Sequence, residues 1–189
     1  PGSDDVGKDY EIKMTALLAL RAINQPDIKD VWLGSNVNEA GDFDDVVLFV
    51  ENQQGNSTAY LMQMKHQYNP RDIKPEHFMQ QKSKEMTKER KNLPKDFSLE
   101  KYLKSYLNIK NALKKSVEGD IGILKSLQSV DEIILVLYTN RGVSKKCDFW
   151  SQVDYKSFLN TCENETGIFK LKDSLDYDSD FVKKLLLFA

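Results

Sequence analysis

The chain has 189 residues, two cysteines, two histidines and a formal net charge of −2. This length suits one domain with enough core to fold unaided, and no apolar stretch approaches the roughly 20 residues that span a bilayer. Two isolated cysteines, Cys147 and Cys162, without a signal peptide indicate a reducing intracellular compartment, cytoplasmic or nuclear. We therefore expect neither a disulfide scaffold nor a membrane protein, and a zinc site or a cysteine protease has little support.

The two ends of the chain affect how the domain is delimited. We interpret residues 1–6 as a tag remnant or a flexible N-terminus, and residues 7–189 as a single domain. Because the sequence stops on an apolar segment without a polar tail, we expect a piece of a longer protein with further domains. The sequence leaves the oligomeric state open, a homo-oligomer included.

Charge is distributed unevenly along the chain. Residues 1–64 hold 4 basic and 11 acidic side chains, residues 65–115 hold 14 and 6, and the remainder holds 9 and 12. An acidic part followed by a basic part suits a protein that holds a metal ion and attracts phosphate. The candidate nucleic-acid-binding residues are Lys82, Lys84, Lys88, Arg90 and Lys91. Glutamates mixed among them at helical spacing fit a solvated helix face equally well.

The spacing of apolar residues predicts the elements of the first half of the chain. It indicates an amphipathic helix over residues 10–23 and a short strand over residues 30–37. Two further strands, over residues 43–50 and 59–66, are joined by a polar turn and are expected to form a hairpin. A surface helix is then predicted over residues 76–92.

The second half of the chain predicts more helices and strands around one sheet. A long helix is expected over residues 97–115 with Ser98 at its N-cap, followed by a strand over residues 131–140 that is buried on both faces. An edge strand over residues 167–172 is predicted between short helices at 156–162 and 181–189. The predicted class is therefore α/β, a central mixed β-sheet flanked by helices.

Polar side chains interrupt the two strands of the predicted hairpin. Because side chains alternate between faces, Gln63 and Lys65 share one face of their strand. A lysine in a buried strand requires a charged partner or a cleft that contains water, and the nearest acids are Asp44 and Asp45 across the hairpin. Adjacent residues point in opposite directions, so we choose Asp45 as the residue that faces Lys65. Asp44 contributes if a bulge opens the strand.

This arrangement resembles the PD-(D/E)XK nuclease superfamily, whose fold is restriction-endonuclease-like. In that pattern an aspartate opens one strand, and an acid or amide, any residue and a lysine close the next. The matching residues are Asp45 (or Asp44), Gln63 and Lys65, and Glu11 stands where the superfamily often has a helical glutamate. Gln63 replaces the commoner acid, a variant that the superfamily contains. The resemblance implies a restriction-endonuclease-like core over residues 7–66 plus the strand near residue 135.

The resemblance also implies a function. It points to a Mg²⁺- or Mn²⁺-dependent nuclease that hydrolyses phosphodiester bonds of DNA or RNA, with Asp45, Gln63 and Asp44 as metal ligands. Lys65 would support the attack and Glu11 would assist. The alternative is a catalytically inactive nuclease-fold module for recognition or oligomerisation in a larger protein, which the sequence pI near 5.8 favours. Two structural interpretations stay open: Lys65 protects a strand edge, and Glu11 complements the dipole at a helix start.

Overall fold

The computed structural model describes residues 3–79, 97–115, 123–155, 158–159 and 167–189. Its centre is a seven-stranded sheet in the order β1-β2-β3-β4-β7-β6-β5. The strands are β1 (Ile28–Gly34), β2 (Val46–Asn52), β3 (Ser57–Lys65), β4 (Glu132–Thr139), β5 (Trp150–Gln152), β6 (Ile168–Leu171) and β7 (Leu185–Phe188). Strands β3, β4 and β7 run parallel and the other pairs are antiparallel, so the predicted mixed sheet of an α/β fold is confirmed.

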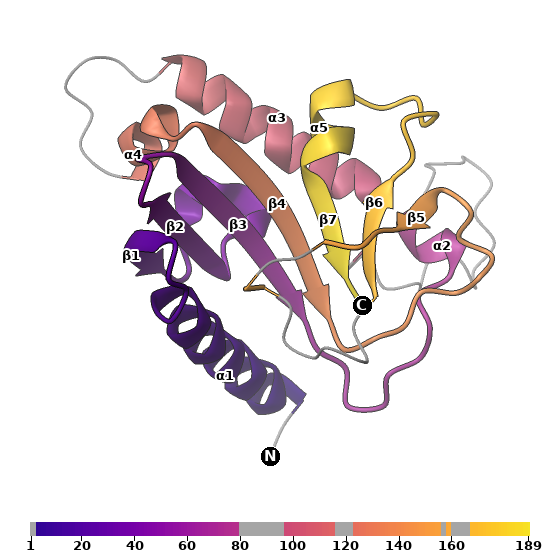
Figure 1. Cartoon of the computed structure of the whole chain (residues 1–189). Coiled ribbons are helices and arrows are strands. Elements are labelled where there is room, and N and C mark those ends of the chain that lie inside the picture. Colours follow the sequence, from indigo (N-terminus) through magenta and orange to yellow (C-terminus); the bar gives the residue numbers. More distant parts are fainter. Residues whose placement is uncertain (1–2, 80–96, 116–122, 156–157, 160–166) are drawn as a thin grey trace.

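Helices cover both faces of this sheet (Figure 1). They are α1 (Ser3–Ile23), the 3-10 helix η1 (Asn38–Phe43), α2 (Pro75–Phe78), α3 (Leu99–Lys115), α4 (Ile123–Ser129) and α5 (Ser179–Lys184). Buried side chains of α1 pack on one face, with Leu18 beside Val46 and Met62 in one cluster. On the other face, Tyr102 of α3 packs in a cluster with Leu61. The alternation of strand side chains thus produces two separate cores.

The predicted hairpin is confirmed. Strands β2 and β3 pair antiparallel with Val46 opposite Met62. Strand β3 pairs in parallel with β4 from Thr58 opposite Glu132 to Lys65 opposite Thr139. The C-terminal ends of β3 and β4 therefore lie next to each other, and the N-terminal end of β2 lies beside them.

The long helix and the strand around residue 135 were also predicted correctly. Ser98 caps α3, since its Oγ accepts a hydrogen bond from the Lys101 amide at 3.4 Å. Helix α1 begins at Ser3, earlier than expected. None of the helices in the described part of the chain is long and apolar enough to cross a membrane.

Two predictions for the C-terminal part are wrong. Strand β6 is not an edge strand, because it lies between β7 and β5. Only the first half of the segment over residues 181–189 is helical, and Leu185–Phe188 forms β7 inside the sheet. All four residues of β7 are buried, and they alternate between the two cores, so an entirely apolar run satisfies both faces. The helices predicted over residues 76–92 and 156–162 fall largely outside the described residues, apart from the short α2.

Candidate functional site

Side chains of helix α3 hold the turn before β2 in place. The Asp42 amide donates a hydrogen bond to Ser105 Oγ at 2.7 Å, and Asp42 Oδ1 forms an ion pair with Lys101 Nζ at 2.9 Å. Gly41 has φ of 60° and approaches Ser105 so closely that a Cβ would lie 2.4 Å from its Oγ. The Asp44 carbonyl accepts from the Val37 amide at 3.1 Å. These contacts fix the backbone that leads into Asp44 and β2.

Asp45 and Gln63 are in direct contact. The Gln63 side-chain nitrogen donates a hydrogen bond to Asp45 Oδ2, and the Met64 amide donates to the same oxygen at 2.6 Å. Gln63 is 5% exposed, so this contact is shielded from water. Val46, the first residue of β2, lies opposite Met62, and the side-chain hydrogen bond brings Asp45 and Gln63 together, as predicted. Because Gln63 donates through its nitrogen, its carbonyl oxygen remains for a cation or a water molecule.

Glu11 belongs to the same electrostatic environment. Burial raises the pKa of Glu11, the negative charge of Asp45 raises it further, and the positive charge of Lys65 opposes them. Burial also raises the pKa of Asp44, with an additional contribution from Asp45 and an opposing one from Lys65. Helix α1 thus brings Glu11 to the hairpin. Since α1 begins at Ser3, Glu11 lies beyond the first turn, and the helix-dipole interpretation is wrong.

Lys65 lies at the end of an internal strand. Strand β3 is bounded by β2 and β4, so the interpretation of Lys65 as an edge protector is wrong. The neighbouring His66 points the other way, since its ring packs 4.7 Å from the ring of Tyr10 in α1. Lys65 is half-buried, and its positive charge acts on the carboxylates of Glu11 and Asp44.

A contact that the sequence did not reveal holds the end of β3. The Gln67 amide donates to Asn140 Oδ1 at 3.0 Å, and Asn140 Nδ2 donates to the Gln67 carbonyl at 2.8 Å. This reciprocal pair fixes the chain two residues after Lys65. Ser105 and Lys101, which position the turn before β2, were missed in the same way. These partners lie some 60 to 70 residues apart, so no local pattern could indicate them.

The donor atoms fit a hard divalent cation in part. Within the described residues, no group of three or more His, Cys, Asp or Glu side chains is arranged to hold a metal ion. Asp45 and the Gln63 carbonyl would therefore supply part of a coordination shell, which water and phosphate oxygens would complete. Burial and the negative charge of Asp45 raise the pKa of Glu11 and of Asp44, and added positive charge would oppose both shifts.

The predicted nucleic-acid-binding residues, Lys82, Lys84, Lys88, Arg90 and Lys91, lie outside the described residues. The chain matches no family model, no curated protein and no solved structure.

Proposed function

We propose that this chain is a metal-dependent nuclease of restriction-endonuclease-like fold that hydrolyses phosphodiester bonds of DNA or RNA. The contact between Asp45 and Gln63, beside Lys65, is the observation that carries the proposal. The arrangement of elements supports it, because α1, the antiparallel strands β1 to β3 and the parallel strand β4 come from the residues over which the sequence resemblance extends.

Each residue of the site has a proposed role. Asp45, held by two donors, and the Gln63 carbonyl oxygen would bind Mg²⁺ or Mn²⁺, and Asp44 would add charge nearby. When bound, such an ion polarises a phosphate and lowers the pKa of a coordinated water. Lys65 would neutralise the negative charge that develops on the phosphate. Glu11, with its raised pKa, would accept a proton from the attacking water.

One observation favours the second candidate, a catalytically inactive nuclease-fold module. The Gln63 amide already satisfies Asp45 Oδ2 without any cation, and a neutral ligand attracts a divalent ion less than a carboxylate does. In that case the same contact serves to hold β2 and β3 together.

A nuclease panel separates the two candidates. Plasmid DNA, single-stranded DNA and RNA are incubated with Mg²⁺ or Mn²⁺, and thermal melts are recorded with and without each ion. For the nuclease, we expect cleavage that a chelator abolishes and a Tm that the metal raises, because a ligand of the native state stabilises it. For the inactive module, we expect neither effect.

The matched variants are Lys65→Ala and Lys13→Ala. Lys13 is an exposed lysine of α1, and its substitution removes the same charge away from the site. We expect Lys65→Ala to lower the cleavage rate by about 100-fold or more with an unchanged circular dichroism spectrum, and Lys13→Ala to cleave normally. Cleavage at the wild-type rate by Lys65→Ala would contradict the assigned role of Lys65.

A further inference from the structure

A cavity of about 500 Å³ lies over strands β1, β2 and β3, at the end of the sheet away from the candidate nuclease site. The strand register places Asp30 opposite Glu51, and Trp32 opposite Phe49. These two rows form the floor of the cavity, and Ser126, Ser129 and Val130 close one side. We call Asp30, Trp32, Phe49 and Glu51 the β1 surface. It is remote along the strands from Gln63 and Lys65, and nothing in the proposed nuclease chemistry uses it.

Trp32 presents a large aromatic ring to solvent in a fixed orientation. Its side chain is 50% exposed, although tryptophan is ordinarily well buried. The ring packs edge-on against Phe49, with ring centroids 5.2 Å apart. It also lies over Gly34, where a Cβ would come within 2.7 Å of Trp32 Cη2. Because Gly34 has no side chain, it leaves room for the indole of Trp32, which offers a flat contact surface.

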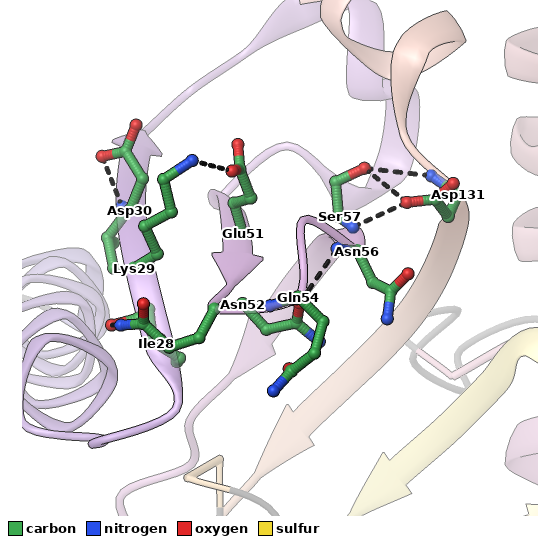
Figure 2. A network of polar contacts seen from close by, with 11 residues as sticks. Ile28, Lys29, Asp30, Glu51, Asn52, Gln54, Asn56, Ser57 and Asp131 are labelled. Carbon is green, nitrogen blue, oxygen red and sulfur yellow. Dashed lines mark hydrogen bonds and ion pairs between the residues drawn. The ribbon is translucent and has the colours of Figure 1, made fainter.

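The charge of the β1 surface favours a cationic occupant. Asp30 and Glu51 are direct neighbours across the β1–β2 pair, where two like charges destabilise a sheet. Lys29, at the register irregularity of β1, turns toward Glu51 and pairs with it (Figure 2). No lysine, arginine or histidine is among the residues that line the cavity in the described part of the chain. Because Lys29 already offsets the charge of Glu51, the net negative charge of this row is that of Asp30, which repels a phosphate backbone and attracts a cation.

Strand β1 also offers a backbone for pairing. It ends the sheet, and β2 is its only partner among the described strands. Asp30 and Trp32 alternate onto the cavity side, so a peptide strand added along β1 would place every second side chain beside them on that face. Asp30 Oδ1 accepts from the Val31 amide at 2.8 Å, a bond that is visible in Figure 2 and that the carboxylate could exchange for a bond to a ligand.

We propose that the β1 surface docks an extended peptide segment that carries arginine. A guanidinium group stacks flat on an indole and bonds a carboxylate with two parallel N–H groups. Trp32 and Asp30 offer these two contacts, because they lie two residues apart on the same face of β1, with Glu51 opposite Asp30. A lysine ammonium lacks this planar match. The occupant is therefore a partner protein with a basic, strand-forming segment, and binding would extend the sheet by one strand.

The test uses a capped, fluorescently labelled peptide of alternating valine and arginine, and a second peptide with citrulline in place of arginine. Citrulline has nearly the same shape without the charge. Fluorescence anisotropy should show binding of the arginine peptide, with affinity at least tenfold weaker for the citrulline peptide. Amide NMR shifts should change along Ile28–Gly34. Equal affinity for the two peptides, or no binding at about 1 mM, would overturn the proposal.

Variants locate the binding on this surface. Trp32→Ala and Glu51→Gln should each weaken binding of the arginine peptide at least tenfold. Glu100→Gln is the matched control, since Glu100 is also a partly exposed carboxylate in an ion pair with a lysine. Intrinsic fluorescence of the wild type gives a second readout, because Trp150, the other tryptophan, is buried. Unchanged binding by both β1-surface variants would overturn the assignment, and melting curves verify that each variant is folded.

Discussion

The Gln63 side-chain nitrogen donates a hydrogen bond to Asp45 Oδ2 across the β2–β3 pair. The contact joins an amide to a carboxylate at the place where the sequence pattern more commonly has two acids. It stabilises the hairpin in the absence of metal, because it satisfies a half-buried carboxylate oxygen and the amide of a buried glutamine. The same contact leaves the site with less negative charge for a cation.

Gln63→Glu should lower the stability of the metal-free protein and raise its affinity for a divalent cation. A glutamate at this position loses the bond to Asp45 and places a second carboxylate beside it, so we expect the metal-free protein to lose about 1–3 kcal/mol of stability. Affinity for Mg²⁺ or Mn²⁺ should rise, because another carboxylate attracts a hard cation. Calorimetry measures the affinity and melting curves measure the stability. Gln54→Glu, in the exposed β2–β3 turn, is the control. Unchanged or weaker metal affinity would mean that Gln63 does not face the ion.

Glu11→Gln should stabilise the metal-free protein at neutral pH. The folded-state pKa of Glu11 is raised above its usual value of 4.5, so its stabilising effect is present below that value and is lost as the pH rises through the folded-state pKa. At higher pH the ionised carboxylate destabilises the fold, and the variant should melt about 1–3 °C higher than wild type.

The difference between Glu11→Gln and wild type should disappear below about pH 3.5, where Glu11 is protonated in both the folded and the unfolded state. Thermal melts across this pH range measure the effect, with the exposed Glu39→Gln as control for the loss of one charge. A Glu11→Gln variant that melts at or below the wild-type Tm at pH 7 would refute the electrostatic coupling of Glu11 to the site.

Gly41→Ala should destabilise the turn that carries Asp44 and Asp45. The position has φ of 60° and faces Ser105, so an added methyl group meets both backbone strain and a close contact. We expect a loss of about 1–3 kcal/mol from the strain, and more from the contact. Gly55→Ala is the matched control, since φ there is 84° and nothing lies within 4 Å of a built Cβ. Equal losses in the two variants would show that the contact with Ser105 contributes nothing.

The basic segment that contains Lys82, Lys84, Lys88, Arg90 and Lys91 should make nucleic-acid binding depend on salt. If the lysines and arginine of this segment neutralise phosphates, replacing Lys88, Arg90 and Lys91 by glutamine should reduce the slope of log affinity against log salt by about 0.9 per lost contact on duplex DNA. Anisotropy titrations with Ca²⁺ in place of Mg²⁺ measure this slope. A triple glutamine variant of the exposed Lys145, Lys146 and Lys172 controls for the change in net charge. Equal slopes in the two triple variants would rule out a specific phosphate-binding role.

The central part of the candidate site could be predicted from the sequence because it is local. Gln63 and Lys65 lie in β3 and Asp45 directly precedes β2, and the period-two alternation of side chains decides which residues of this hairpin share a face. The long helix α3 and the buried strand β4 were equally readable, since each has an uninterrupted apolar pattern of its own period.

Other features depended on contacts between distant segments. The apolar run Leu185–Phe188 is compatible with a helix and with a strand. It forms β7 because it pairs with β4 on one side and with β6 on the other. Glu11 joins the site because the Leu18 face of α1 packs over the sheet, and Ser105 orients the turn before β2 from 63 residues away. The sequence by itself determined which residues share a strand face, because backbone geometry sets that alternation. The tertiary structure decided which faces meet, because packing buries apolar surface regardless of separation along the chain.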